Sequence, residues 1–326
     1  MTVLVTGAAG FIGFHAARAL LDRGEAVVGL DDLNDYYDVS LKEARLERLT
    51  ADKSFRFEHA NLAEPDVLAR LLKKHKAVSK VLHLAAQAGV RHSLTHPEPY
   101  LQTNVVGQLR VLEACRHADK VEQLVYASSS SVYGANTKVP FAVEDRVDHP
   151  VSLYAATKRS GELLSESYAR LYRLPQTGLR FFTVYGPWGR PDMSAYIFTR
   201  AILAGEPIDV FNHGDMRRDF TYIDDIVAGV LAALDRPPDD GRASPPHRLY
   251  NLGNHRAEPL MRFIELIEAA CGRKAEINLT DMQPGDVPET YADIEASRRD
   301  LGFAPKTTIE EGIPKFVAWY RDYHGV

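Results

Sequence analysis

The segment YAATK places the phenol of Tyr154 and the ammonium group of Lys158 four residues apart in a stretch with helical spacing. Residues i and i+4 lie on one face of an α-helix, so both side chains can point into one site. A protonated lysine favours the phenolate and lowers the tyrosine pKa from its usual value of about 10. A phenolate can act as a general base at neutral pH, although Tyr-x-x-x-Lys also occurs by chance in many helices.

A glycine-rich motif near the N-terminus suits the binding of a dinucleotide. TGAAGFIG spaces Gly7, Gly10 and Gly13 as G-x-x-G-x-x-G, after an apolar run expected to be a strand and at the start of a helix. Glycines let the backbone approach a pyrophosphate, and the helix N-terminus offers N–H donors. Asp31 ends the next apolar run, where a carboxylate can bind ribose hydroxyls and repel a 2′-phosphate. The pattern predicts NAD rather than NADP, although Asp31 could also be a solvated carboxylate or a helix cap.

The elements that must position these residues alternate between strand and helix. Strand-like runs at 2–7, 25–32, 80–86 and 123–130 alternate with helical patterns at 11–24, 66–75, 103–118 and 152–172. After about residue 175 the order is less regular, with a strand and loop at 174–186, helices at 194–205, 222–236 and 259–272, and a polar surface loop at 237–247. The pattern predicts an α/β fold with a Rossmann-type doubly wound parallel sheet.

We expect two domains in this fold. Residues 1–180 form the NAD-binding Rossmann domain, which includes the Tyr154/Lys158 helix. Residues 181–326 form mainly a smaller, mixed α/β substrate domain, with some segments returning to the Rossmann sheet. The total length gives ample residues for a sizeable core.

Composition narrows the class of protein. The chain has 326 residues and a net charge of -5, so no nucleic-acid footprint is expected, and no apolar run is long enough for a membrane span. The N-terminus lacks the pattern of a signal peptide. Cys115 and Cys271 are expected to be reduced thiols of a cytoplasmic protein. The histidines show no ligand spacing, so we predict no metal.

Several motifs in order resemble the extended short-chain dehydrogenase/reductases, in the nucleotide-sugar epimerase and dehydratase group. They are the glycine motif, HLAA at 83–86, SSSSVYG at 128–134, the Tyr154/Lys158 pair and RRDFTYIDD at 217–225. Within the group, the chain is most similar to the UDP-glucuronate 4-epimerases in the stretches 33–46, 85–94, 180–193 and 282–293. The resemblance covers nearly the whole chain. It implies NAD-dependent epimerisation of UDP-glucuronate to UDP-galacturonate through a transient 4-keto sugar.

The resemblance implies three catalytic residues. Tyr154 is the general base, Lys158 holds the cofactor ribose and tunes Tyr154, and Ser129 binds the sugar O4. The resemblance also implies a tightly bound NAD+ whose site includes Tyr154 and Lys158. The other expected cofactor-binding residues are Gly7, Gly10, Phe11, Ile12, Gly13, Asp31, Asn34, Asn61, Leu62, Leu84, Ala85, Ala86, Gln87, Asn104 and Phe181.

Two positions depart from the family pattern, and three others extend the resemblance to the nucleotide part of the substrate. Asn61 stands where relatives often have Asp against the adenine, and His92 stands where Tyr is expected, which leaves the role of His92 open. Arg218 and Asp286 match positions that grip the diphosphate and the uridine ribose of a UDP-sugar. Phe211 is a candidate to stack near the uracil, or it packs as an ordinary interior aromatic.

The serine run separates epimerisation from related reactions. Similar sugar dehydratases carry an acidic pair before VYG, and uronate decarboxylases carry a Glu there, whereas this chain has Ser130 and Ser131. Hydroxyl groups can bind a carboxylate but are poor proton shuttles. For the substrate carboxylate we favour Arg190, helped by Thr183 and the serines, because Arg suits bidentate binding. A surface or diphosphate-binding role for Arg190 is the alternative, and Arg91 is a second candidate.

Other functions remain open at this stage. The chain could be a UDP-glucose/UDP-galactose 4-epimerase, a UDP-glucuronate decarboxylase, or an NAD-binding regulatory protein without chemistry. The helices expected at 152–172 and 104–118 are candidates for a homodimer helix bundle, as in the family. The pair Tyr36 and Tyr37 either shapes a loop over the site or packs in the core.

Overall fold

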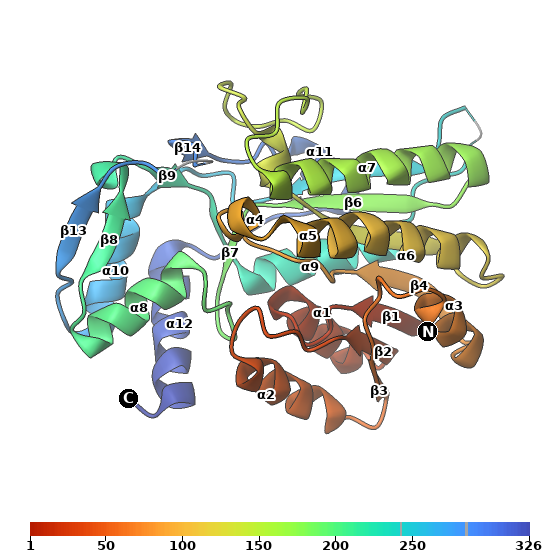
Figure 1. Ribbon diagram of the computed structural model, residues 1–326, viewed down its shortest axis with the longest axis horizontal. Helices are drawn as coiled ribbons and strands as arrows, with labels where there is room; N and C mark the ends of the chain where they lie inside the picture. The colour runs from red at the N-terminus through yellow and green to blue at the C-terminus, as the bar shows by residue number, and fades with distance from the viewer. Residues whose placement is uncertain (242, 284–285) are drawn as a thin grey trace.

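The centre of the computed structural model, which describes residues 1–241, 243–283 and 286–326, is a seven-stranded parallel sheet (Figure 1). The strand order is β11-β6-β5-β4-β1-β2-β3, and every neighbouring pair is parallel. The strands are β1 (Thr2–Thr6), β2 (Ala26–Asp31), β3 (Phe55–His59), β4 (Val78–His83), β5 (Gln123–Ser129), β6 (Gln176–Phe181) and β11 (His247–Leu252). The predicted α/β class and the Rossmann-type parallel sheet are therefore confirmed.

Helices cover both faces of this sheet. On one face, α1 contacts both α2 and α9, and α9 contacts α11; on the other, α6 contacts both α3 and α7. These helices are α1 (Phe11–Asp22), α2 (Val39–Thr50), α3 (Val67–Lys74), α6 (Gly107–Arg116), α7 (Leu153–Tyr172), α9 (Ile223–Asp235) and α11 (Glu295–Leu301). Short helices α4 (His92–Thr95), α5 (Pro97–Tyr100) and the 3₁₀ turn η2 (Ser130–Tyr133) connect them.

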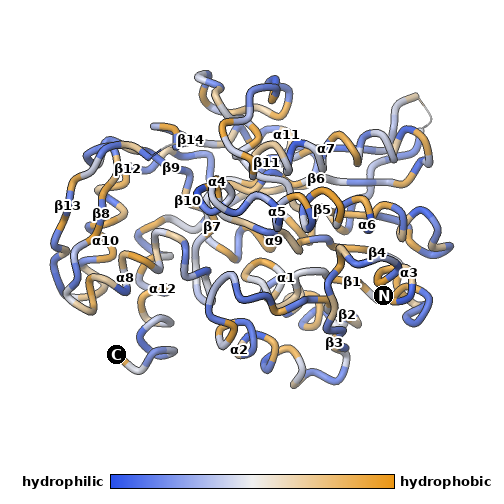
Figure 2. The backbone as a smooth tube through the Cα atoms, viewed as in Figure 1, coloured by the Kyte–Doolittle hydropathy of each residue, from blue (hydrophilic) through white to orange (hydrophobic). Residues whose placement is uncertain are grey.

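The alternation of side chains along the strands explains the two layers. Val3 and Val5 of β1 pack with Phe14 and Leu20 of α1, whereas Leu4 packs with Val111 and Leu112 on the opposite side. Such two-sided burial favours consecutive apolar residues, and Figure 2 shows orange stretches, interrupted by polar residues, among the central strands.

The C-terminal part adds small sheets and helices beside the carboxyl ends of the main strands (Figure 1). The pairs β7–β10 and β8–β13 and the trio β12-β9-β14 form these sheets. Their bounds are β7 (Thr183–Tyr185), β8 (Ile208–Phe211), β9 (Arg217–Arg218), β10 (Phe220–Tyr222), β12 (Glu258–Pro259), β13 (Ile277–Thr280) and β14 (Glu289–Thr290). The helices are α8 (Ser194–Ala204), η3 (Asn212–Gly214), α10 (Leu260–Cys271) and α12 (Ile309–His324). The proposed domain boundary at residue 180 stays a prediction.

Three features differ from the sequence expectation or were missing from it. The helix expected over 103–118 begins as a π-helix, η1 (Leu101–Val106), which precedes α6. The segments of α2, β3 and α12 were not expected as elements, and β11 follows directly after the polar stretch expected as a loop. Position 242 of that loop lies outside the described residues.

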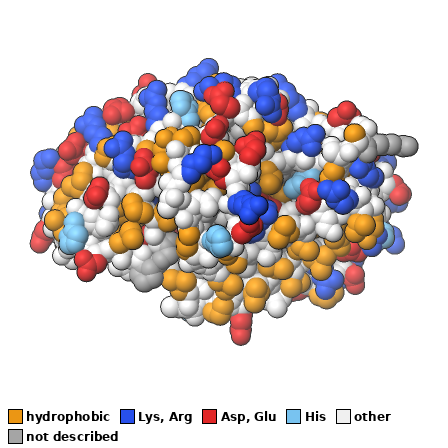
Figure 3. Space-filling model, turned by 90° about the horizontal axis from the view of Figure 1, so that it is seen from above, with side chains coloured by type: hydrophobic (Ala, Val, Ile, Leu, Met, Phe, Trp, Pro, Cys, Tyr) orange, Lys and Arg blue, Asp and Glu red, His pale blue; other side chains and the backbone are white. Residues whose placement is uncertain are grey.

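The described surface carries charges of both signs. On the face seen in Figure 3, Lys and Arg side chains are interspersed with Asp and Glu. Among the helices of the described ranges, none combines the length and apolarity that crossing a membrane requires. A search of the same ranges finds no group of three or more His, Cys, Asp or Glu side chains placed to hold a metal ion.

Candidate functional site

The site begins where the strand order reverses, between β1 and β4. Gly7 follows β1 with φ +72°, and a Cβ there would lie 2.7 Å from the backbone nitrogen of Ala85. A Cβ on Gly13 would lie 1.9 Å from the Gly7 carbonyl oxygen. Only glycine fits these close approaches, which open α1 toward the crevice at the carboxyl ends of the strands. The loop is therefore shaped to receive a diphosphate at a helix N-terminus.

A cavity of about 990 Å³ extends from this loop to the C-terminal part of the chain. All but one of the predicted site residues line it. The expected cofactor residues in its wall are Gly7, Gly10, Phe11, Ile12, Gly13, Asp31, Asn34, Asn61, Leu62, Leu84, Ala85, Ala86, Gln87, Tyr154, Lys158 and Phe181. The expected substrate residues in its wall are Ser129, Ser130, Ser131, Thr183, Arg190, Arg91, Phe211, Arg218 and Asp286.

Asn104 is the exception, because it lies behind the cavity wall. Its side chain accepts a hydrogen bond from the Gln87 backbone N–H and donates to the Gln87 carbonyl, both at 2.9 Å. It also donates to Thr157 Oγ1 at 3.1 Å. The structure thus corrects the expectation of a wall residue: Asn104 fastens the Gln87 loop to α7 from the π-helical turn η1, a type of irregularity frequent at functional sites.

Asp31 is buried at the end of β2. Its carboxylate accepts backbone hydrogen bonds from Ala9 at 3.0 Å and Leu33 at 2.9 Å. Burial raises the pKa of Asp31, against the opposing effects of the Leu33 N–H and the Lys42 ammonium. The cavity wall here carries a carboxylate fixed beside the glycine loop, and the neighbouring cation Lys42 was not singled out from the sequence.

The helix α7 positions the Tyr154/Lys158 pair. Ser152 caps its N-terminus, with Oγ accepting from the Ala155 N–H at 3.1 Å. Lys158 is buried, donates to the Ala127 carbonyl at 3.0 Å, and places Nζ 6.0 Å from the centre of the Tyr154 ring. Both side chains face the cavity, as the i, i+4 spacing predicted.

Burial shifts the pKa values of both members of the pair. Burial raises the pKa of Tyr154, and the opposing influence comes from the Ser129 hydroxyl and the Arg190 guanidinium rather than from Lys158. Burial and the Arg190 charge lower the pKa of Lys158 to about 8, whereas Glu162 opposes this shift. The prediction that Lys158 lowers the Tyr154 pKa therefore stays a prediction, which concerns the site with its cofactor bound.

A buried ion pair supports the strand end that carries the serines. Glu162 accepts from Arg180 at 2.8 and 2.9 Å and from the Ser128 hydroxyl at 2.6 Å. Ser129 lies one residue further, where its Oγ caps η2 by accepting from the Ser131 N–H at 3.2 Å. Ser129 therefore caps η2 and also lines the cavity.

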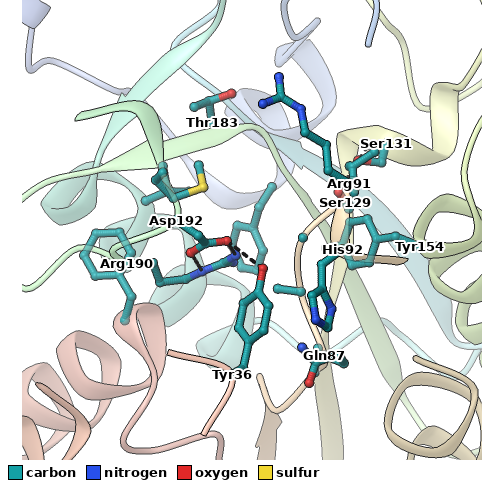
Figure 4. A pocket seen from close by; sticks show the side chains of 18 of the residues that line it. Tyr36, Gln87, Arg91, His92, Ser129, Ser131, Tyr154, Thr183, Arg190 and Asp192 are labelled. Carbon is teal, nitrogen blue, oxygen red and sulfur yellow. Dashed lines mark hydrogen bonds and ion pairs between the residues drawn. The ribbon is translucent and has the colours of Figure 1, made fainter. Parts of the chain in front are cut away.

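Arg190 lies in the loop before α8 and is already paired. Its Nε and Nη2 donate to the two carboxylate oxygens of Asp192 at 3.0 and 2.5 Å (Figure 4). The Tyr36 hydroxyl donates to the same carboxylate at 3.0 Å. Burial opposes ionisation of both partners, but their mutual attraction raises the pKa of Arg190 and lowers that of Asp192. Arg190 is thus a half-buried cation in the wall of the cavity that holds Tyr154, and its role as a carboxylate ligand stays a prediction.

Arg91 also lines the cavity and contacts two other predicted site residues. Its guanidinium stacks over the Phe211 ring at 4.2 Å and donates to Asp286 at 2.9 Å. These two residues are the ones expected at the uracil and the ribose. Arg218 donates to the Pro288 carbonyl at 2.9 Å nearby. Arg91 therefore contacts the residues expected at the nucleotide, and its alternative role as a carboxylate ligand stays a prediction.

From the sequence, Asp192 and Lys42 were not identified as residues of this wall, and no role was assigned to His92. Asp192 follows Arg190 by two residues, and the spacing R-x-D could have indicated an ion pair. Lys42 carries no local signal, because its place depends on how α2 packs against α1 and β3. His92 lies edge-on to Tyr36 at 4.9 Å and stacks on His96 at 4.2 Å, so it covers the Tyr36 side of the cavity.

Comparison with known proteins agrees with this site. The profile of the NAD dependent epimerase/dehydratase family matches residues 3–253. UDP-glucuronate 4-epimerase 4 of Arabidopsis thaliana is 48% identical over 334 residues, which cover 99% of this chain and 76% of that protein. Protein CapI of Staphylococcus aureus is 49% identical over 335 residues, with 99% of each chain covered.

A solved structure extends the likeness to three dimensions. The crystal structure of UDP-glucuronic acid 4-epimerase from Bacillus cereus, in complex with UDP-glucuronic acid and NAD, superimposes with a TM-score of 0.90 at 34% identity. The match covers 99% of this chain and 100% of that one. With the glycine loop, the buried Asp31 and the Tyr154/Lys158 pair in one cavity, this chain belongs to the NAD dependent epimerase/dehydratase family.

Proposed function

We propose that this protein is an NAD-dependent UDP-glucuronate 4-epimerase, an isomerase that interconverts UDP-glucuronate and UDP-galacturonate. The observation that carries the proposal is the one cavity whose wall contains a dinucleotide loop, the Tyr154 phenol and the half-buried Arg190 cation. A neutral sugar offers no group to match that cation. A uronate offers a carboxylate, which Arg binds in bidentate fashion.

Different residues of the cavity serve proton transfer, cofactor binding and support of the site. Tyr154 accepts the proton of the sugar O4 and returns it after the keto sugar has turned over, with Ser129 holding the oxygen. NAD, held by the glycine loop, Asp31 and Lys158, supplies the redox chemistry by taking the C4 hydrogen as hydride and giving it back. Asn104 keeps the Gln87 loop in place behind the cofactor site. Epimerisation leaves the cofactor as it began, which suits a tightly held NAD.

The absence of an acid beside the serines favours epimerisation over decarboxylation. A 4-keto uronate is a β-keto acid that can lose carbon dioxide if a proton donor meets the forming enolate. Ser130 and Ser131 stand in the cavity wall where an acidic residue would be needed. Thr183 and these hydroxyls can hold the carboxylate with Arg190 without supplying a proton.

Two finer points complete the proposal. A homodimer through α7 and the η1–α6 segment is supported by exposed apolar side chains, with Leu163 at 54%, Leu171 at 66% and Leu101 at 46% exposure. A cytoplasmic location is supported by two free, buried cysteines, Cys115 and Cys271.

Proton NMR of the sugar tests the proposal. We expect the purified protein to convert UDP-glucuronate to UDP-galacturonate without added NAD and without a UDP-pentose. Conversion of UDP-glucose in place of UDP-glucuronate would contradict the proposal and indicate a neutral-sugar epimerase. A UDP-pentose product would indicate a decarboxylase. Neither substrate reacting, with NAD added, would leave an NAD-binding regulator as the better account.

A further inference from the structure

The carboxylate of Asp192 occupies one full edge of the Arg190 guanidinium. Both contacts, Nε to Oδ1 at 3.0 Å and Nη2 to Oδ2 at 2.5 Å, come from the same side of the planar group. The pair is largely screened from solvent, with side-chain exposures of 22% and 28%. This is the fork geometry in which Arg binds any carboxylate, whether from the protein or from a ligand.

Asp192 is itself held by a third residue. The Tyr36 hydroxyl donates to Oδ2 at 3.0 Å, from the loop between β2 and α2. Tyr36, Asp192 and Arg190 all line the cavity that holds Tyr154 (Figure 4). The Asp192 carboxylate therefore binds the Arg190 guanidinium, and the hydrogen bond from Tyr36 holds it in that position.

We propose that Asp192 competes with the substrate carboxylate for Arg190 and so sets how tightly a uronate is held. The inference rests on the proposed function, because only a uronate substrate brings a carboxylate to this cation. When the sugar carboxylate takes the Nε/Nη2 edge of Arg190, Asp192 must give up that edge. When the keto sugar turns over, its carboxylate must leave Arg190, and Asp192 returns to the guanidinium.

The competition has a measurable consequence for selectivity. Without Asp192, the half-buried Arg190 cation loses its counter-charge, and it binds a uronate carboxylate more strongly. A neutral UDP-hexose gains nothing from the same change. Asp192 therefore weakens uronate binding selectively, which leaves the carboxylate free to move during the reaction.

The test compares Asp192→Asn with the unchanged chain in a Tyr154→Phe background, which stops turnover during the measurement. Calorimetric titration of the protein with its bound NAD gives Kd for UDP-glucuronate and for UDP-glucose. We expect Asp192→Asn to lower the Kd for UDP-glucuronate about tenfold. The Kd for UDP-glucose should change by less than about twofold. Asp192→Glu is the matched control, because it keeps the carboxylate, and it should keep the ratio of the two Kd values near that of the parent.

Other outcomes would overturn the inference. An unchanged ratio in Asp192→Asn, or weaker uronate binding, would mean that Asp192 only positions Arg190. Tyr36→Phe repeats the test while the charges of Arg190 and Asp192 are kept. It removes the hydroxyl that holds Asp192, so the Kd for UDP-glucuronate should fall, but by a smaller factor. An unchanged ratio of the two Kd values in Tyr36→Phe would also contradict competition between Asp192 and the substrate carboxylate. If the wild-type protein converts UDP-glucose but not UDP-glucuronate, the proposed function fails as well, whereas conversion of UDP-glucuronate with unchanged ratios refutes only the role of Asp192.

Discussion

At the scale of single residues, burial raises the pKa of the phenol that we propose as the general base. Tyr154 lies in a wall where desolvation raises its pKa, and the main opposing group is the Ser129 hydroxyl, followed by Arg190. Spacing in the sequence predicted the shared face of Tyr154 and Lys158, but the direction of the pKa shift depends on depth in the cavity. Depth is a property of the assembled fold, so the local pattern could not supply it.

Replacing Ser129 by Ala is expected to shift the pH profile of catalysis. Without the hydroxyl, the phenolate of Tyr154 loses a stabilising hydrogen bond, so the pKa of Tyr154 rises further. The acidic limb of kcat/KM against pH should then move to higher pH, and activity at neutral pH should fall by about tenfold or more. Ser129→Thr keeps a hydroxyl and should leave the limb near its original position. An unmoved limb in Ser129→Ala would show that Ser129 does not tune Tyr154.

At the scale of elements, the loop that carries Arg190 is fastened to the helices beside the glycine motif. Arg45 of α2 is fully buried and donates to the carbonyls of Ala9 at 2.9 Å and Trp188 at 2.7 Å. It also donates to the Tyr37 hydroxyl at 2.7 Å. His15 of α1 bonds the Pro187 carbonyl at 2.9 Å. The substrate loop and the cofactor loop are thereby coupled through one guanidinium.

Arg45→Met is expected to destabilise the fold and loosen the Arg190 loop. The change leaves the Ala9 and Trp188 carbonyls without their donor, which should lower the free energy of unfolding by about 2 kcal/mol. The Kd for UDP-glucuronate should rise as well. Arg48→Met is the control: Arg48 is exposed on the same helix and stacks on Trp188 at 4.2 Å, so its loss should cost under about 1 kcal/mol. Urea unfolding of both variants measures the difference, and equal losses would refute the role of Arg45.

The element scale also shows what the sequence could predict. Alternating apolar runs indicated β1, β2, β4, β5 and the helices α1, α3 and α6, because a parallel sheet buried on both faces leaves a strong local pattern. The strand β11 follows a polar stretch, and its pairing with β6 is set by long-range packing. The Arg190–Asp192–Tyr36 contact joins positions 156 residues apart. Motifs therefore predicted which residues line the cavity, but not which of them hold one another.

At the scale of the whole molecule, buried neutral histidines make the fold sensitive to acid. Burial lowers the pKa of His15 to about 4 and that of His83 to about 3, against 6.5 for an ordinary histidine. His83 is hydrogen-bonded to Thr6 at 2.7 Å within the main sheet. Below pH 6.5 the unfolded chain therefore binds protons that the folded chain does not bind.

Stability is expected to fall as the pH drops from about 6.5 toward 4. Each of the two histidines should contribute up to about 1.4 kcal/mol of lost unfolding free energy per pH unit in that window. Chemical denaturation at pH 7.5 and pH 5 measures the loss. His83→Asn should lower stability at pH 7.5 but reduce the difference between the two pH values. An equal difference in the variant would mean that His83 does not contribute to acid sensitivity.

The central claim is that the hydrogen at C4 leaves and returns within one cavity that also holds a uronate. The most direct measurement is the reaction of UDP-glucuronate in deuterium oxide, followed by proton NMR and mass spectrometry. Tyr154 exchanges only the O4 proton, so the account predicts UDP-galacturonate with protium at C4 and C5 and no added mass on carbon. Deuterium at C4 or C5 of the product would show that a carbon-bound hydrogen is exchanged with solvent, and it would contradict the account.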